Sequence, residues 1–315
     1  MNFLLIGGIG YVGGRLASYL KSCGHRVCIS TRRDLEEVPE WVIADEVICF
    51  DPDNGDSSGL LLDGMDAVVY LAAPNEIDSA KNPCSALRAG GELTWKVLEA
   101  LTERNVPPPF LYLSTFHVYG SNATGEITET ISPLPIHPYA LGRYFGECVV
   151  QLFRARKKVT ALCVRLSNAF GAAAGQNVLR HSLVFNDLCR QAVIERSLTL
   201  KSTGAQKRNF IAMEDVVRAI EFLAMRADEW PSDGLIHLGS AIHLSILEVA
   251  EMISQRSEAL LGFRPRIIVP EGGGEDYVVD FVFSIERLKR MGFVWNNRIE
   301  KEIDDTLLLY SGSRR

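Results

Sequence analysis

A glycine-rich turn near the N-terminus constrains the fold of this chain more than any other stretch. The apolar run Phe3-Leu4-Leu5-Ile6 predicts a buried strand, and Gly7, Gly10 and Gly13 follow it. The next segment predicts a helix that stops at Gly24 and has one apolar face, formed by Val12, Leu16, Tyr19, Leu20 and Cys23. Glycines at this spacing let a strand turn sharply into a helix and let a diphosphate approach the helix's free N–H groups. The turn therefore predicts a dinucleotide-binding site.

Composition narrows the class of protein. The 315 residues are 47% hydrophobic and carry a formal net charge of −6, so the chain can bury a large core but offers no basic surface for nucleic acid. The seven cysteines are scattered without a CxxC pair, which indicates small buried side chains in a reducing compartment and no metal site. No apolar run is long enough to span a membrane, and the N-terminal strand leaves no room for a signal peptide. We therefore expect a soluble cytoplasmic protein with no membrane partner.

Strand-like and helical patterns alternate along the first half of the chain. Further strands are predicted at 27–30, 47–50, 67–72, 110–113 and 160–166, and helices at about 84–105, 139–156, 183–194, 215–225 and 246–253. This alternation, with nearly continuous apolar strands, predicts a parallel sheet covered by helices on both faces. The pattern loosens after Asn168. We expect a dinucleotide-binding domain over 1–168, with a contribution from about 205–240, and an interleaved, mainly substrate-binding region over 169–315.

The residues after the second predicted strand bear on the choice of cofactor. An acidic side chain there would hold the ribose 2′-hydroxyl of NAD, whereas arginine accommodates the 2′-phosphate of NADP. The chain has Arg32 and Arg33, with no carboxylate before Asp34. This favours NADPH, although NAD remains possible and the two arginines could simply be solvated. Asp51, after the third predicted strand, would lie near the adenine or form a turn before Pro52.

Acid–base chemistry is indicated by two later segments. Ser114 and Thr115 end a predicted strand, at the sheet edge where open α/β sheets bind ligands. Tyr139 and Arg143 are four residues apart at the start of a predicted helix, so they share one face. A cation beside a phenol lowers the phenol's pKa from about 10 and makes it usable near neutral pH. A surface contact between the two residues is the alternative.

Taken together, these segments resemble the extended short-chain dehydrogenases/reductases, the family of nucleotide-sugar epimerases, dehydratases and 4-ketoreductases. Matches occur in the family's order at the glycine turn, Leu71-Ala72-Ala73, Ser114-Thr115, Val118-Tyr119-Gly120, Pro138-Tyr139, Arg165 to Gly171, and Arg208-Asn209-Phe210-Ile211 followed by Glu214-Asp215-Val216. They span about residues 3–220. The resemblance implies an α/β fold of Rossmann type, with a doubly wound parallel sheet and a smaller mixed C-terminal substrate-binding region.

The resemblance also implies roles for individual residues. Tyr139 would exchange a proton with the substrate carbinol, Thr115 would hydrogen-bond the same oxygen, and Arg143 would stand in the place of the family lysine. Cofactor contacts are implied for Gly7, Gly10, Tyr11, Val12, Arg32, Arg33, Asp51, Leu71, Ala72, Ala73, Tyr139 and Arg143. Substrate contacts are implied for Asn75, His117, Asn168 and Arg208, the last two at the diphosphate. The alternatives are a packed histidine at His117, a strand-end cap at Asn168 and a salt bridge at Arg208; His137 is interpreted as a loop residue.

Departures from the family pattern refine the expected activity. Arginine at position 143 keeps the charge of the lysine but cannot relay a proton, because a guanidinium is effectively never deprotonated. Ala89 replaces an asparagine that is usual in the fourth helix. Phe116-His117 stands where the sugar 4,6-dehydratases carry Asp-Glu, which argues against dehydration.

We therefore expect an NADPH-dependent reductase of a nucleotide-linked sugar with a keto group, at C4. The alternatives are a 4-epimerase or 4-dehydrogenase that retains NAD, and a regulator that binds a dinucleotide but catalyses weakly. The family resemblance also implies a homodimer formed through the helices at about 84–105 and 139–156. Its possible contacts are Trp95, Leu98, Leu152 and Phe153.

Overall fold

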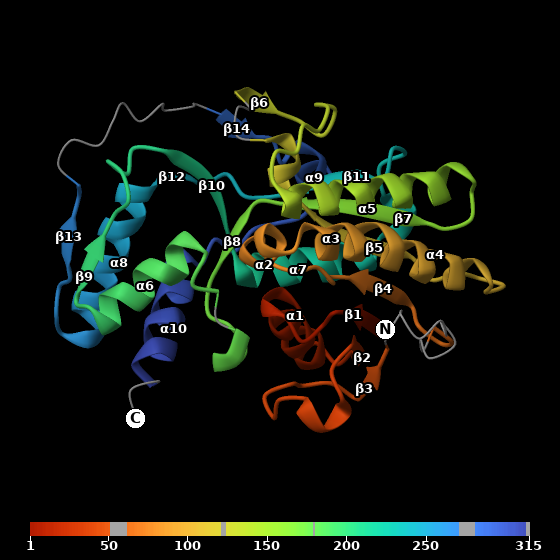
Figure 1. Cartoon of the computed structure of the whole chain (residues 1–315), viewed down its shortest axis with the longest axis horizontal. Coiled ribbons are helices and arrows are strands. Elements are labelled where there is room, and N and C mark those ends of the chain that lie inside the picture. The colour runs from red at the N-terminus through yellow and green to blue at the C-terminus, as the bar shows by residue number, and fades with distance from the viewer. Residues whose placement is uncertain (51–61, 121–123, 179, 271–280, 313–315) are drawn as a thin grey trace.

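A seven-stranded parallel sheet forms the centre of the computed structural model, which describes residues 1–50, 62–120, 124–178, 180–270 and 281–312 (Figure 1). Its strands are β1 (Asn2–Ile6), β2 (Arg26–Thr31), β3 (Glu46–Cys49), β4 (Ala67–Tyr70), β5 (Phe110–Thr115), β7 (Ala161–Leu166) and β11 (Leu235–Leu238). They lie in the order β11-β7-β5-β4-β1-β2-β3, and every neighbouring pair is parallel. The predicted Rossmann-type sheet is confirmed, with β11 as a seventh strand that the sequence pattern did not reveal.

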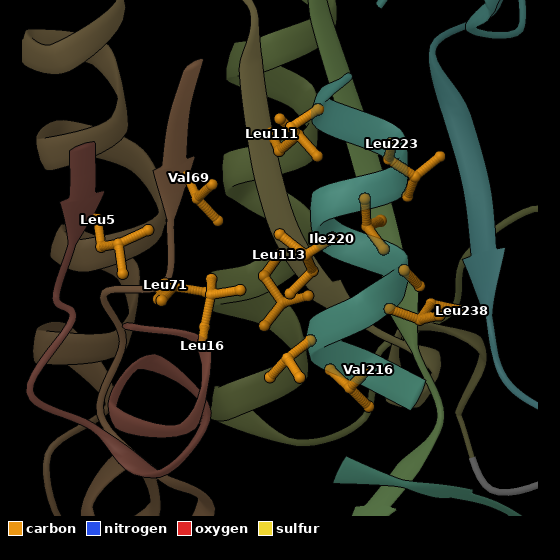
Figure 2. Packing of buried hydrophobic residues seen from close by; sticks show 14 of the residues in the cluster. Leu5, Leu16, Val69, Leu71, Leu111, Leu113, Val216, Ile220, Leu223 and Leu238 are labelled. Carbon is orange, nitrogen blue, oxygen red and sulfur yellow. The ribbon is translucent and has the colours of Figure 1, made fainter. Parts of the chain in front are cut away.

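Both faces of the sheet are buried by helices. Leu5 and its alternate neighbours pack against α1 (Tyr11–Ser22) and α7 (Met213–Ala224), while Leu4 and Ile6 pack on the opposite face against α4 (Thr94–Thr102) and α5 (Pro138–Ala155). Figure 2 shows the first of these cores, with side chains of α7 directed at those of the sheet strands. Because successive strand residues point to opposite faces, both sets must be apolar, which explains the unbroken apolar runs in the sequence.

The glycine turn joins β1 to α1 as its spacing predicts. Gly7 has a φ of +78°, and a Cβ there would lie 2.8 Å from the Cα of Ala72 at the end of β4. A Cβ on Gly13 would lie 2.5 Å from the carbonyl oxygen of Gly8. Any side chain at these two positions would therefore push the helix away from the sheet.

The helix predicted at 84–105 is present as a continuous helical stretch over 83–102, but it changes type at its centre and ends earlier than predicted. The chain forms α3 (Pro83–Leu87), the π-helix η4 (Arg88–Leu93) and α4, which ends at Thr102. The wider turn lets η4 pack tightly on α5, where a Cβ on Gly90 would lie 1.8 Å from the carbonyl oxygen of Gly142. The carbonyl of Ala89 accepts a hydrogen bond from the Tyr70 hydroxyl at 2.5 Å. A main-chain group is therefore bonded where the family usually has an asparagine side chain.

A second group of helices lies beside the sheet region, at the left of Figure 1. It contains α6 (Val184–Ile194), α8 (Ile246–Leu261) and α10 (Ile299–Gly312), which share one apolar core. The helix α8 extends beyond the end predicted at 253, from a capping box of Ser245 and Glu248 to Gly262. The small sheets β12-β10-β8 and β13-β9 border this region, whereas the third small sheet, β14-β6, lies apart from it and packs against Val118 and Tyr119. Their strands are β6 (Gly125–Ile127), β8 (Asn168–Phe170), β9 (Ser197–Thr199), β10 (Lys207–Ala212), β12 (His243–Ser245), β13 (Arg266–Ile268) and β14 (Phe281–Phe283).

The short elements are α2 (Glu76–Lys81), α9 (Glu286–Arg290) and the 3₁₀ turns η1 (Leu35–Glu37), η5 (Phe116–Tyr119), η6 (Gln176–Val178) and η7 (Ala227–Glu229). Among the described residues, no helix combines the length and apolar character needed to cross a bilayer. In the same ranges, no group of three His, Cys, Asp or Glu side chains is arranged to hold a metal ion.

The observed burial of individual side chains corrects two further expectations. Leu98 and Phe153, predicted as contacts between subunits, lie in the core between the sheet and its helices, whereas Trp95 and Leu152 are exposed. Helix periodicity alone did not separate the residues that face the sheet from those that face outward. The cysteines are also not uniformly buried: Cys28, Cys163 and Cys189 are, and the other four are exposed.

Candidate active site

One cavity of about 910 Å³ lies along the carboxyl ends of the central strands. Its volume is at the upper end of the range for small-molecule sites, about 300–1,000 Å³. Fifteen predicted site residues line it: Gly7, Gly10, Tyr11, Val12, Arg32, Arg33, Leu71, Ala72, Ala73, Asn75, Thr115, His117, Tyr139, Arg143 and Asn168. Arg208 is not among the lining residues, and Asp51 lies outside the described residues. Segments far apart in the sequence thus meet at one site.

The glycine end of the cavity fits a diphosphate. Helix α1 begins at Tyr11, so the N–H groups of Tyr11 and Val12 are in its first turn and have no partner within the helix. Gly10 has an ordinary φ of −94°, and a Cβ there would meet only the Gly7 carbonyl oxygen, at 3.6 Å. No protein atom therefore requires glycine at position 10, and a side chain would instead occupy space at the cavity. This is the arrangement expected where the backbone must approach a ligand.

Tyr11 contributes its backbone to this end of the site, not its hydroxyl. The hydroxyl donates to the carbonyl of Gly171 at 2.7 Å, and Asn186 lies 3.3 Å away on the other side. Burial raises the pKa of Tyr11, with the hydrogen bond from Asn186 acting in the opposite direction. The phenol is thus a structural tie between α1 and the segment after β8.

Arg32 and Arg33 follow β2, which pairs with β1 beside the glycine turn. Both line the cavity and are exposed, and in the described part of the chain neither guanidinium has a carboxylate partner. The main-chain N–H of Arg33 donates to the Thr31 hydroxyl at 3.1 Å, which holds the turn after β2. Two guanidinium groups without internal partners are suited to a phosphate.

Tyr139 and Arg143 face the cavity from the first turns of α5. Pro138 is the first residue of the helix, and the His137 ring accepts the N–H of Tyr139 at 3.1 Å. His137 is a loop residue, as interpreted, and its ring also caps the helix that carries Tyr139. The guanidinium carbon of Arg143 lies 5.7 Å from the centre of the Tyr139 ring. The spacing of four residues does bring the two side chains together.

Arg143 is a buried cation fixed to the end of β4. Its Nη2 donates to the carbonyl of Leu71 at 3.1 Å, and its Nη1 is 3.5 Å from the carbonyl of Ala72. Its Nε is buried and has no hydrogen-bond partner among the described residues. Burial acts to lower the pKa of Arg143, but the phenols of Tyr139 and Tyr112 outweigh it and the pKa is raised. The site therefore keeps a permanent positive charge and one donor that a bound ligand could satisfy.

The turn η5 presents Thr115 and His117 to the same cavity. The Thr115 hydroxyl accepts the N–H of His117 at 3.3 Å and can still donate its own proton. The His117 ring is open to the cavity and lies 6.5 Å from the Tyr139 ring, measured between centres. Desolvation of the ring by the surrounding protein atoms lowers the pKa of His117 to about 4, although the negative charge of Glu76 acts to raise it. The imidazole is therefore neutral near pH 7.

The remaining predicted substrate residues have distinct settings. Asn168 lines the cavity while its amide donates to the carbonyl of Asn209 at 2.9 Å, so the side chain also has a main-chain partner at the start of β8. Asn75 caps α2 by accepting the N–H of Asp78 at 2.9 Å. Arg208, on β10, has no carboxylate partner in the described ranges, and burial lowers its pKa. The salt bridge considered for Arg208 is absent there, because Glu214 and Asp215 pair with Arg298 and Arg218.

Sequence reasoning missed an ion pair at this cavity. Arg180 contacts Glu76 at 2.5 Å, and both line the cavity from segments on either side of it. The two residues are 104 positions apart, so no local pattern could have paired them. By contrast, the glycine turn and the segments around Thr115 and Tyr139 could be detected, because each is contiguous in the sequence.

Known proteins resemble the chain over most of its length. It is 26% identical over 211 residues to an uncharacterized UDP-glucose epimerase, YtcB, of Bacillus subtilis (strain 168), a match covering 66% of this chain and 64% of that protein. The chain spans about half to two thirds of the length of the first curated relatives that it matches. Two solved structures share its fold. They are MoeE5 in complex with UDP-glucose and NAD (TM-score 0.78, 22% identity, all of both chains) and RMD from Pseudomonas aeruginosa complexed with NADPH (TM-score 0.78, 21% identity, 99% of this chain and 100% of that one).

A family model gives the broadest assignment. The model described as the NAD dependent epimerase/dehydratase family matches residues 3–239. That range contains β1, the glycine turn, η5, Tyr139 and Arg143. Because the match covers well over half of the chain, the protein belongs to the NAD-dependent epimerase/dehydratase family, of the extended short-chain dehydrogenase/reductase type.

Proposed function

We propose that the protein reduces a keto group, at C4, of a sugar linked to a nucleoside diphosphate, with NADPH as reductant. The observation that carries the proposal is the group of Tyr139, Thr115 and the buried Arg143 cation at one cavity. Two arginines after β2, which have no carboxylate partner among the described residues, favour a cofactor with an additional phosphate. Within the molecule, residues 1–168 and about 205–240 would bind the dinucleotide, and 169–315 would mainly bind the sugar nucleotide.

Different residues of the chain would bind the cofactor and the sugar nucleotide. The first-turn N–H groups of α1 would hold the cofactor diphosphate, Arg32 and Arg33 the 2′-phosphate, and the Nε of Arg143 a ribose hydroxyl. A bound nicotinamide would supply hydride to the carbonyl carbon. Arg208, half-buried and without an acidic partner among the described residues, would pair with the substrate diphosphate. Asn75, His117 and Asn168 would complete that side.

Tyr139 would donate its hydroxyl proton to the carbonyl oxygen as that oxygen becomes a hydroxyl. The Arg143 charge would stabilise the phenolate that remains, and Thr115 would hold the same substrate oxygen. Because arginine does not release a proton at neutral pH, Tyr139 must be reprotonated from solvent or from a ligand hydroxyl and not from residue 143.

The main alternative is a 4-epimerase or 4-dehydrogenase that retains NAD. Its support is the likeness to YtcB and to MoeE5, whose structure holds UDP-glucose and NAD. A second alternative is a dinucleotide-binding regulator with weak turnover, since lysine is replaced at position 143. The absence of Asp-Glu after Thr115 argues against a dehydratase, although dTDP-glucose dehydratases are among the relatives.

One assay separates these functions. Purified protein is mixed with NADPH and enzymatically prepared 4-keto sugars linked to UDP or dTDP, and the reduced-nicotinamide absorbance is followed. We expect that absorbance to fall with one of them. Conversion of UDP-glucose to UDP-galactose without added cofactor, in a protein that already carries nicotinamide absorbance, would favour the epimerase. Cofactor binding without turnover of any sugar would favour the regulator.

Variants in the same assay test the cofactor choice. Replacing both Arg32 and Arg33 with alanine should raise the KM for NADPH by about 10- to 100-fold, because charge-assisted hydrogen bonds are lost. The KM for NADH should not change. Arg26→Ala, at the start of the same strand and paired with Glu46, is the matched control. An equal effect on both cofactors would show that the two arginines do not bind a 2′-phosphate.

We further propose that the protein is a homodimer formed by α4 and α5. Phe145 is 47% exposed, and Leu141, Leu152 and Trp95 are exposed on the same two helices. An apolar face of this kind is usually covered by a partner. Phe145→Glu should convert a dimer into a monomer in light scattering, whereas Leu308→Glu, at an equally exposed leucine on α10, should not. A wild-type monomer would refute the dimer.

A further inference from the structure

A buried chain of hydrogen bonds runs behind the cavity end of β5. Ser114 donates its hydroxyl to Glu147 of α5 at 2.5 Å, and Arg165 of β7 pairs with the same carboxylate at 2.7 Å. The side chains of Glu147 and Arg165 are each 4% exposed. A charge pair removed from water to this extent must be satisfied by its neighbours, and here several bonds fix both groups in place.

The chain continues from Arg165 into the C-terminal half. Arg165 Nη1 donates to the Tyr119 hydroxyl at 2.5 Å, and this hydroxyl lies 2.6 Å from Nε2 of His237 on β11. The other ring nitrogen, Nδ1, is 2.8 Å from the carbonyl of Ser284, just after β14. The path thus links β5, α5, β7, η5, β11 and the segment after β14.

Donor and acceptor chemistry allows one arrangement of protons in a neutral ring. The Ser284 carbonyl can only accept, so Nδ1 of His237 carries a proton and Nε2 is an acceptor. The Tyr119 hydroxyl accepts from Arg165 and has one proton to donate. Its two acceptors are Nε2 of His237 at 2.6 Å and the carbonyl of Thr128 at 3.2 Å, and the shorter contact favours Nε2. Burial, with the charges of Arg165 and Arg287, lowers the pKa of His237 to about 3 despite the Ser284 bond, so the ring stays neutral. It is also stacked on Phe283, with ring centres 4.1 Å apart.

The chain reaches the cavity through the turn η5. Tyr119 is the last residue of that turn, which starts directly after Thr115 and contains His117. Thr115 and His117 line the cavity, but Tyr119, Glu147, Arg165 and His237 do not. The chain also meets the cavity at its other end, because Ser114 lines it. A hydrogen bond at Tyr119 acts on the His117 side of the cavity by setting where the turn lies.

We propose that Tyr119 and His237 are positioning residues, which fix the turn that follows Thr115 and carries His117 beside the sugar nucleotide. The effect on turnover rests on the proposed function; the effect on the turn does not. Without the link between Tyr119 and His237, the turn would lose its hydrogen bond to β11, while its apolar contacts with β14, such as Phe116 on Phe283, would remain. Thr115 would then meet the substrate oxygen in a less favourable geometry.

Tyr119→Phe tests this directly. We expect kcat to fall by about 10- to 100-fold, as for a displaced catalytic group, with an unchanged KM for NADPH. Hydrogen–deuterium exchange followed by mass spectrometry should quicken in the peptide covering 114–120 and not elsewhere. Tyr310→Phe is the matched control, because it also removes a buried phenol beside a histidine, His181, but within α10. Its kcat and exchange in 114–120 should match wild type.

Two variants of His237 distinguish loss of the hydrogen bond to Tyr119 from general misfolding. His237→Gln keeps an acceptor for the Tyr119 hydroxyl and should retain more activity and slower exchange in 114–120 than His237→Leu, which has none. Equal behaviour of the two variants, or unchanged exchange in 114–120 in Tyr119→Phe, would overturn the proposal. Faster exchange throughout the molecule would also overturn it. If wild type turns over no sugar nucleotide, the proposed function fails, while the exchange measurements still decide whether these residues hold the turn.

Discussion

Tyr139→Phe is expected to lower turnover by about 10²- to 10⁴-fold, the contribution of a positioned acid–base group. The substitution removes only the hydroxyl, so the ring should keep its place beside Arg143 and His117. The capping bond from the Tyr139 N–H to the His137 ring involves the main chain and is also kept. Binding of NADPH, followed by quenching of protein fluorescence, should therefore change little. The loss should lie in kcat.

A tyrosine on the same helix provides the control. Tyr144 is in α5 but does not line the cavity, so Tyr144→Phe should turn over at the wild-type rate. If Tyr139→Phe kept a substantial fraction of the wild-type rate, the proton would have to come from another group. His117, which also lines the cavity near the Tyr139 ring, would then be the first residue to replace. A loss of NADPH binding in Tyr139→Phe would mean instead that the hydroxyl serves the cofactor.

Much of the fold was predictable because its determinants are local. A strand that is buried on both faces must be apolar at successive positions, and that pattern is visible in Phe3–Ile6 and in the strand that ends at Leu166. The glycine turn could also be predicted, because backbone atoms lie too close to Gly7 and Gly13 for any side chain at these positions. The Tyr139–Arg143 pair followed from helical spacing alone.

What could not be predicted depends on contacts distant in sequence. The π-helix at 88–93 forms where Gly90 meets Gly142, and neither glycine signals the other. The Leu98 and Phe153 error has the same origin, since periodicity defines a helix face but not what covers it. The link between Tyr119 and His237 joins residues 118 positions apart. The ion pair of Glu76 with Arg180 likewise joins distant segments and leaves no local pattern in the sequence.

The largest expected loss of stability is at Glu302, a residue in no recognised motif. This carboxylate of α10 is 2% exposed and pairs with Arg15 of α1, with Nη2–Oε1 at 2.6 Å and Nη1–Oε2 at 2.9 Å. It also accepts the N–H groups of Ala172 at 3.3 Å and Glu214 at 2.9 Å. Gly171 is required beside it, because a Cβ there would lie 2.2 Å from the carboxylate. One side chain thus joins α10 to the glycine-turn helix, to the segment after β8 and to α7.

Glu302→Ala should lower the free energy of unfolding by about 3–5 kcal/mol, because it leaves Arg15 and two main-chain donors without their acceptor. Urea unfolding followed by circular dichroism measures the change. Glu300→Ala, two residues earlier on α10, is the control: its carboxylate is 70% exposed and pairs with Arg256 at 3.3 Å. An exposed pair of this kind contributes about 0–1 kcal/mol. Equal losses in the two variants would show that burial of Glu302 does not govern its effect. A small loss in both would mean that α10 is held to α1 and α7 by apolar packing alone.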